Sequence, residues 1–405
     1  MIKLSDIRTV WELQRQTGFQ KDVGLERELI RKLPVELNAH ALVIAGIRRC
    51  GKSTLLEQLM RKAPEDVFFL NFDTPRLFRF ELKDFELLDL LIDECGKKHL
   101  FFDEIQVVEG WELYVRQKLD EGFRLTITGS NASLLSRELG TKLTGRHVSK
   151  ELFPFSFNEY LRFRMLEGGK ESFEAYMQEG GFPEYLKMSN SDILLSLFDD
   201  IVYRDIAVRY GIRDVNSMKG LLLYLVANVG SLVTATKLSQ MLGLKSRSTV
   251  LEYLSFFEQS YLLRLMPKFS YSYRSQLVNP RKVYFIDPAF AGQLSVSFGK
   301  DRGHLLENIL YWELRRKGWN LYYWNEHNCE CDFVACRENI PQKLIQVCYE
   351  LNGDNEGREV KGLIDAMDSL KLEDAVIVTL DQKDIIRQQD RRINVVPVYE
   401  FLKVL

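Results

Sequence analysis

The sequence lacks the features of a membrane-spanning or secreted protein. Its longest apolar stretch, residues 220–235, is interrupted by Asn228, Gly230 and Ser231, so it is too short and too broken to cross a bilayer. The first six residues, Met1 to Asp6, contain no apolar segment of the kind found in signal peptides. We therefore expect a cytoplasmic protein that does not contact a membrane.

An excess of one charge sign is also missing. The chain has 55 Lys and Arg against 57 Asp and Glu, and its net charge is −2. The composition as a whole therefore gives no sign of a polyanionic partner, although it leaves room for a local basic patch. At 405 residues, of which 46% are hydrophobic and 28% charged, the chain is typical of a globular protein of about three domains.

Cysteine and histidine are scarce. Six cysteines in 405 residues, in a chain without a signal peptide, indicate reduced thiols. Four of them fall close together, so a zinc site has to be considered: Cys329, Cys331, Cys336 and Cys348. Their spacing is not the paired C-x-x-C form of structural zinc sites, and His327, although near, does not complete a ligand set. Zinc stays an alternative at this stage.

A phosphate-binding pattern stands out against this background. Gly46 to Ser53 fits G-x-x-x-x-G-K-[ST], between an apolar run at 41–45 and an amphipathic run at 53–62. A buried strand, a glycine loop and a helix N-terminus build an anion site, because backbone N–H groups and the helix dipole point at the phosphates. Lys52 is predicted to contact the β- and γ-phosphates, and Ser53 to ligate Mg²⁺. The predicted nucleotide-binding loop residues are Gly46, Ile47, Arg48, Arg49, Cys50, Gly51, Lys52, Ser53 and Thr54.

A second strand ends in two carboxylates about fifty residues later. Apolar residues at 100–102 lead into Asp103 and Glu104. Asp103 is predicted to hold Mg²⁺, and Glu104 to polarise the attacking water as general base. The alternative is that both residues only cap the following helix. The upstream glycine loop favours the catalytic interpretation.

A glycine-bounded arginine follows further along the chain. Arg146 comes after Gly145 and precedes a predicted strand at 148–153. An arginine at such a place is a candidate for stabilising γ-phosphate charge, from its own subunit or from a neighbouring one. The alternative role is that of a surface arginine. Both remain open.

These motifs occur in an order that resembles a group of prokaryotic AAA-superfamily ATPases. The likeness extends over nearly the whole chain through 46–54, 101–106, 128–131, 145–146, 153–160, 180–184, 203–206, 284–288, 330–334 and 345–347. It implies ATP and Mg²⁺ as cofactors and a polar residue that contacts the γ-phosphate or the water, here Ser130 or Asn131. The alternative for these two residues is to cap a helix expected at 132–135. It also implies a helical lid at 155–213, in which Arg204 could sense the nucleotide; a surface role of Arg204 beside Asp205 is the alternative. The family has no single known task.

Residues 214–295 suggest a winged helix. Helices are predicted at 236–242 and 248–263, and a strand pair at 263–265 and 282–285. The reading helix would begin with side chains that can contact phosphates and bases, namely Lys245, Arg247, Ser248 and Thr249. The basic and aromatic segment 268–274 offers a second contact surface. DNA is thus a candidate partner, and packing against a neighbouring domain is the alternative.

Residues 296–405 resemble a restriction-endonuclease-like domain. Glu307 on the first helix and Asp332 on the second strand match the carboxylates of active members, which bind Mg²⁺. The third-strand positions are Gln346 and Cys348, and a thiol cannot replace the positive charge of the expected lysine. The domain is therefore expected to be degenerate, with nuclease activity as an unfavoured alternative.

The sequence predicts an α/β protein in four parts. A P-loop NTPase core at 1–154, a parallel sheet with flanking helices, is followed by the helical lid, the winged helix and the endonuclease-like domain. The leading hypothesis is Mg²⁺-dependent ATP binding and hydrolysis that drives a conformational change of the attached domains. The alternatives are a nucleotide-gated DNA-binding or signalling switch with little turnover, and an ATPase-coupled nuclease. A protein partner or a homo-oligomer is left open.

Overall fold

The computed structural model describes residues 2–18, 23–34, 37, 39–62, 66–132, 143, 145–244, 246–295, 301–326, 329–388 and 391–405. The chain divides into two compact units, Met1–Phe153 and Pro154–Leu405. Among the described residues, no helix combines the length and the apolar character needed to cross a membrane.

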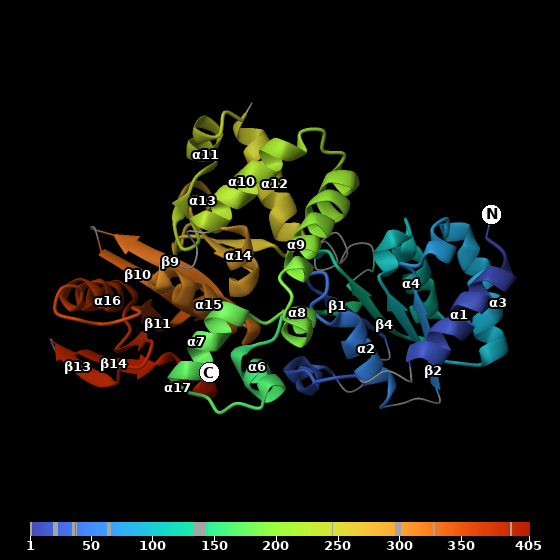
Figure 1. Cartoon of the computed structure of the whole chain (residues 1–405), viewed down its shortest axis with the longest axis horizontal. Helices are drawn as coiled ribbons and strands as arrows, with labels where there is room; N and C mark the ends of the chain where they lie inside the picture. The colour runs from blue at the N-terminus through green and yellow to red at the C-terminus, as the bar shows by residue number, and fades with distance from the viewer. Residues whose placement is uncertain are drawn as a thin grey trace. The chain divides into compact units, whose positions relative to one another are not determined.

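The first unit is built on a five-stranded parallel sheet (Figure 1). The strand order is β2-β3-β4-β1-β5, with β1 Ala41–Ala45, β2 Val67–Asn71, β3 His99–Asp103, β4 Arg124–Gly129 and β5 His147–Glu151. The main helices are α1 Leu4–Gly18, α2 Lys52–Met60, α3 Phe85–Cys95 and α4 Trp111–Asp120. Because all five strands run the same way, their carboxyl ends meet at one edge of the sheet.

Burial explains why these segments form strands. All five residues of β1 are buried, as are the last four of β3, as expected for parallel strands covered on both faces. An aromatic cluster packs beside β3, where Phe72, Phe85 and Phe102 lie in edge-on contact and Tyr114 stacks on Phe85. This core holds the ends of the strands, and thus the residues that follow them, in fixed positions.

The second unit begins with a helical region. Its helices are α6 Phe157–Arg164, α7 Lys170–Glu179, α8 Pro183–Met188, α9 Asp192–Asp199, a π-helical segment at Asp200–Val208, and α10 Val215–Ala227. A capping box starts α6, in which Ser156 Oγ accepts from the Glu159 N–H and the Glu159 carboxylate accepts from the Ser156 N–H.

A small antiparallel sheet with its own helices follows. Its strand order is β6-β8-β7, with β6 Leu232–Val233, β7 Leu263–Met266 and β8 Arg281–Phe285. The accompanying helices are α11 Ala235–Met241, α12 Arg247–Gln259, α13 Tyr273–Val278 and α14 Pro288–Leu294. The helix predicted to run to residue 263 ends at Gln259, because the buried strand β7 begins at Leu263.

The C-terminal part of the second unit is a six-stranded mixed sheet. Its order is β13-β14-β12-β11-β10-β9, with β9 Asn320–Glu326, β10 Cys329–Arg337, β11 Ile340–Val347, β12 Asp374–Thr379, β13 Asp384–Gln388 and β14 Arg391–Pro397. The helices are α15 Arg302–Arg316, α16 Glu356–Leu370 and α17 Val398–Val404. Helix α16 covers β10 and β11 (Figure 1), and Gly362 allows its close approach, since a Cβ there would lie 2.3 Å from Glu330 O.

Candidate nucleotide-binding site

The glycine loop joins the carboxyl end of β1 to the N-terminus of α2. Gly46 is required at its start, because a Cβ there would lie 2.1 Å from the backbone oxygen of Leu152. Gly51 adopts a φ of 101°, in the left-handed region that favours glycine. The predicted residues 46–54 therefore form one continuous loop and helix start with the backbone conformation of an anion site.

Lys52 lies folded against its own loop. Its Nζ donates to Gly46 O and Ile47 O at 3.1 Å each, and it lies 3.4 Å from Glu104 Oε1. Burial alone would lower the pKa of Lys52, but the carboxylates of Glu104 and Asp103 outweigh burial and raise it. The side chain is thus a fixed positive charge beside the loop.

Asp103, the last residue of β3, is the most heavily contacted group of the site. Its carboxylate accepts from Ser53 Oγ at 2.7 Å, from Asn71 Nδ2 at 3.0 Å and from Thr128 Oγ1. Burial and the neighbouring Glu104 raise the pKa of Asp103, against the hydrogen bonds from Ser53 and Thr128. A cation at this position would relieve the cost of the buried charge.

The residues present fit a magnesium ion. Mg²⁺ usually binds one or two carboxylates together with water and phosphate oxygens, and Ser53 Oγ with Asp103 offers that donor set. Among the described residues, no group of three or more His, Cys, Asp or Glu side chains could hold a metal ion on its own. Coordination would thus be completed by water and by the nucleotide.

Glu104 occupies a strained backbone position next to Asp103. Its φ is 53°, in the left-handed region that non-glycine residues rarely adopt. Gln106 Nε2 donates to its Oε2 at 2.5 Å and also lies 3.4 Å from Ser130 Oγ. Burial would raise the pKa of Glu104, but Lys52, the Gln106 hydrogen bond and Arg48 lower it. The carboxylate is therefore ionised at neutral pH.

The structure does not bring Arg146 to this group. Arg146 precedes β5, so it lies at the amino ends of the parallel strands, whereas the glycine loop follows the carboxyl end of β1. There its guanidinium pairs with Asp120 Oδ1 at 2.7 Å, and its backbone oxygen accepts from Ala41 N. A contact with the nucleotide in its own subunit is thus unsupported, and a contact with a neighbouring subunit's nucleotide stays a prediction.

The two candidates for the polar residue after β4 are placed differently. The Ser130 hydroxyl accepts from Gln106 Nε2 at 3.4 Å, the same amide that donates to the Glu104 carboxylate. Asn131, buried to 4% exposure, follows directly in the chain, but the helix expected after it at 132–135 falls mostly outside the described residues. The role of either residue, Ser130 or Asn131, stays a prediction.

Sequence reasoning missed several residues of the site. Asn71 and Thr128 hold Asp103, and Gln106 holds Glu104. The buried Arg27 donates to Cys50 O and Phe153 O at 2.7 Å each, which fixes the loop from behind. Asn71 ends β2 and is paired in register with Asp103, so a polar residue closing an apolar strand was an available signal. Arg27 offers no such pattern.

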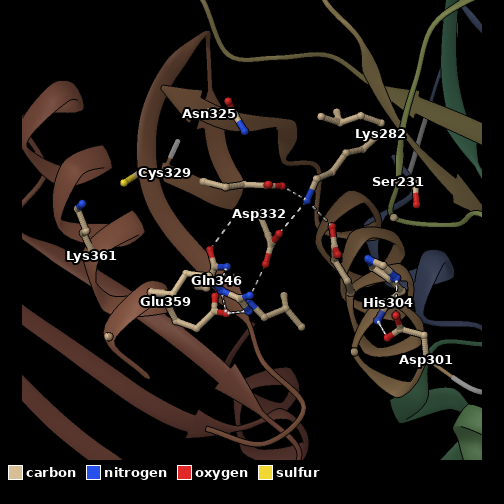
Figure 2. Close-up of a pocket in the computed structure, with 18 residues that line it drawn as sticks. Ser231, Lys282, Asp301, His304, Asn325, Cys329, Asp332, Gln346, Glu359 and Lys361 are labelled. Carbon is tan, nitrogen blue, oxygen red and sulfur yellow. Dashed lines mark hydrogen bonds and ion pairs between the residues drawn. The ribbon is translucent and has the colours of Figure 1, made fainter. Parts of the chain in front are cut away.

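The carboxylates predicted in the C-terminal part also meet, in a cavity of the second unit (Figure 2). Glu307, Asp332 and Gln346 line this cavity of about 1020 Å³, together with Lys282 of β8. Cys348 does not line it; its thiol donates to Glu350 O at 3.1 Å. Zinc finds no support among the described cysteines, and His327 lies outside the described residues.

Two family models match the chain. Residues 38–161 match an AAA domain, and residues 170–301 match a domain of unknown function, DUF8612. An uncharacterized protein of Methanocaldococcus jannaschii is 35% identical over 390 residues, which is 89% of this chain and 87% of that protein. The chain belongs to this family of AAA-domain proteins. An uncharacterized protein of Haemophilus influenzae is 32% identical, over 76% of this chain and 82% of its own length.

Solved structures give weaker matches. Cdc6p from Pyrobaculum aerophilum is 13% identical with a TM-score of 0.27, over 76% of this chain and 93% of its own. Orc1 from Aeropyrum pernix, solved in complex with DNA, is 11% identical with a TM-score of 0.27, over 74% and 92% of the two chains. Scores this low carry no argument about function. The first unit is an AAA P-loop nucleotide-binding domain on its family match and its sheet.

Proposed function

We propose that this AAA-domain protein is a Mg²⁺-dependent ATPase whose nucleotide state moves the second unit. The observation that carries the proposal is the convergence of Lys52, Ser53, Asp103 and Glu104 at one sheet edge, where Ser53 Oγ lies 2.7 Å from Asp103 Oδ2 and Lys52 Nζ lies 3.4 Å from Glu104 Oε1. In an AAA domain these groups suit phosphate binding, metal binding and water activation.

The loop and Lys52 would bind the triphosphate. Without nucleotide, Lys52 donates to two carbonyl oxygens of the loop. Phosphate oxygens are stronger acceptors because they carry charge, so they would replace these carbonyls when ATP binds. Ser53 and Asp103 would hold Mg²⁺, which when bound neutralises charge on the phosphate oxygens. Asn71 and Thr128 keep the Asp103 carboxylate turned toward Ser53.

Glu104 would act as general base. It is ionised, and its two oxygens are held by different groups, Lys52 and Gln106. Transfer of Lys52 from Glu104 to the γ-phosphate would free one carboxylate oxygen for the attacking water. A base of this kind contributes about 10²–10⁴-fold to the rate.

The division of the second unit belongs to the proposal as well. We assign a helical lid to 155–213, a winged helix to 214–295 and an endonuclease-like domain to 296–405. Helices α11 and α12 followed by strands β7 and β8 support the winged helix, and Ser246 caps α12 by accepting from Thr249 N. Contacts to the γ-phosphate that appear and disappear with hydrolysis would drive their motion.

A nucleotide-gated nucleic-acid switch is the second candidate function. Residues 267–281 contain three Lys and Arg and no Asp or Glu. Within this stretch Tyr271 is 82% exposed and Tyr273 is 73% exposed, and helix α13 buries no residue. Exposed aromatic rings beside basic groups suit base stacking and phosphate contact. Lys245, predicted at the start of the reading helix, lies outside the described residues.

Steady-state ATP hydrolysis by wild type and Glu104→Gln, with and without duplex DNA, tests both functions. The ATPase hypothesis expects turnover in wild type and its loss in the variant, with ATP binding retained. If both proteins bind ATP and neither hydrolyses it, the result favours the switch. For the nucleic-acid surface, a Tyr271→Ala, Tyr273→Ala double variant should bind DNA more weakly. A salt titration of wild-type DNA binding with a slope near zero would remove that surface from consideration.

A further inference from the structure

Lys282 is buried among carboxylates in the cavity of the second unit. Its side chain is 4% exposed, and its Nζ lies 2.6 Å from Glu330, 2.8 Å from Asp332 and 3.0 Å from Glu307. Figure 2 shows Lys282 directed at Asp332. An ammonium group has three donors, and here each of them meets one carboxylate.

Lys282 comes from a different part of the fold than its partners. It belongs to β8 of the small sheet, whereas Glu307 lies on α15 and both Glu330 and Asp332 on β10. Burial would lower the pKa of Lys282, but Asp332 and Glu307 outweigh burial and hold the pKa well above the ordinary lysine value. The cavity therefore contains a permanent cation.

Two further oxygens of the expected metal site are engaged elsewhere. Asp332 Oδ2 accepts from Val347 N at 3.0 Å. Gln346 accepts from Asp332 N at 3.1 Å through Oε1, and donates to Glu359 at 2.6 Å through Nε2. Among the described residues, no group of three or more His, Cys, Asp or Glu side chains is arranged to hold a metal ion. The residues therefore do not fit the magnesium ion that the endonuclease likeness implies.

We propose that Lys282 is the resident cation of this cavity and occupies the position that a divalent metal ion would take between Glu307, Glu330 and Asp332. Because the cation is part of the chain, it cannot exchange with metal, and the second unit does not cleave phosphodiesters by metal catalysis. A lysine bound in this way also ties the small sheet to α15 and β10.

The distances from Lys282 Nζ to the three carboxylate oxygens decide which metal ion is suited to test the proposal. Three oxygens 2.6–3.0 Å from a common point are closer to Ca²⁺ coordination, about 2.3–2.6 Å, than to Mg²⁺ coordination, about 2.0–2.1 Å. Replacing the ammonium by an apolar group of similar length should therefore create a Ca²⁺ site. Lys282→Met is that change, and Lys282→Arg is the matched control that keeps the positive charge.

Calorimetric titration of the full chain with Ca²⁺, in the absence of nucleotide, tests the proposal. Lys282→Met should bind one more Ca²⁺ per chain than wild type and gain thermal stability with Ca²⁺, while wild type and Lys282→Arg should not. A variant that adds Glu307→Gln and Asp332→Asn to Lys282→Met should lose the site. If Lys282→Met fails to fold alone, Ca²⁺-dependent refolding that the added substitutions abolish gives the same support.

Two results would overturn the proposal. One is absence of both Ca²⁺ binding and Ca²⁺-dependent refolding in Lys282→Met, because the carboxylates would then not form a cation site. The other is nicking of supercoiled plasmid by wild type with Mg²⁺ or Mn²⁺ that is lost in Asp332→Ala. That second result would show that metal enters despite Lys282. It leaves the nucleotide site of the first unit untouched, so the two proposals fail separately.

Discussion

The close approach of Gly46 to Leu152 makes a single methyl group a test of the nucleotide site. Gly46→Ala would place a Cβ 2.1 Å from Leu152 O. Neither backbone segment can shift easily, because both are held by hydrogen bonds: Leu152 N donates to Ala45 O at 2.8 Å, and Gly46 N donates to Gly129 O at 3.3 Å. The glycine loop would have to move instead.

The size of the movement follows from the distance. Even the shortest tolerated Cβ contact, 3.0 Å, requires a separation about 0.9 Å larger than the structure offers. Overpacking of this kind costs about 1–3 kcal/mol, and the clash with backbone rather than a flexible side chain favours the upper end. In a loop displaced by about 1 Å, the backbone N–H groups no longer point at the phosphates, and misplacement on this scale can lower the rate about 10²-fold.

The assay pairs urea unfolding with ATP binding by calorimetry. Gly122→Ala is the matched control, because its Cβ would meet no atom within 4 Å and only its φ of 81° is unfavourable; such strain costs about 1–2 kcal/mol. We expect Gly46→Ala to lose more stability than Gly122→Ala and to lose ATP affinity, which the control keeps. Equal stability loss with normal ATP affinity in Gly46→Ala would refute the reasoning.

Three further predictions concern single side chains. Lys52→Met should lower ATP affinity by at least about tenfold in a binding titration, because one charge-assisted contact is worth about 1.5–3 kcal/mol. Asn71→Ala, which removes one of the two hydrogen bonds to Asp103 Oδ2, should lower kcat about tenfold and raise the Mg²⁺ concentration for half-maximal turnover; unchanged Mg²⁺ dependence would contradict it. Burial and Asp332 raise the pKa of Glu307 to about 7, so protonation of Glu307 stabilises the folded state. The unfolding free energy of the second unit should therefore fall by at most about 3 kcal/mol as pH rises from 4.5 through 7. Urea titrations at several pH values measure this slope, and Glu307→Gln should flatten it.

Local patterns predicted the parts of the site that follow a strand directly. The apolar runs before Gly46 and Asp103 are buried strands, and in a parallel sheet everything after a strand lies at one edge. That rule brings Lys52, Asp103 and Glu104 together without any knowledge of tertiary contacts. The same rule places Arg146 at the other edge, because it comes before β5, so only its contact with a neighbouring subunit's nucleotide stays a prediction. The order of residue and strand, and not the glycine beside the arginine, carries the information.

Side chains that support the site from other segments escaped prediction. Gln106 and Thr128 are ordinary polar residues in the sequence, and their contacts with Glu104 and Asp103 depend on rotamers and on strand order. Arg27 precedes the first sheet strand, and its contacts with Cys50 and Phe153 depend on how the chain wraps behind the loop. Neither periodicity nor spacing records such contacts.

The cavity of the second unit shows why a motif cannot be interpreted without its surroundings. Glu307 and Asp332 stand where the endonuclease likeness places them, and by themselves they indicate a metal site. Lys282 lies 25 residues before Glu307 and 50 before Asp332, on a strand that sequence reasoning assigned to a different domain. Removing one partner of a buried ion pair costs about 3–5 kcal/mol, so each carboxylate here depends on the lysine for stability. Under the proposal above, Glu307 and Asp332 are ion-paired with Lys282 and contribute to stability, so their presence no longer argues for metal catalysis.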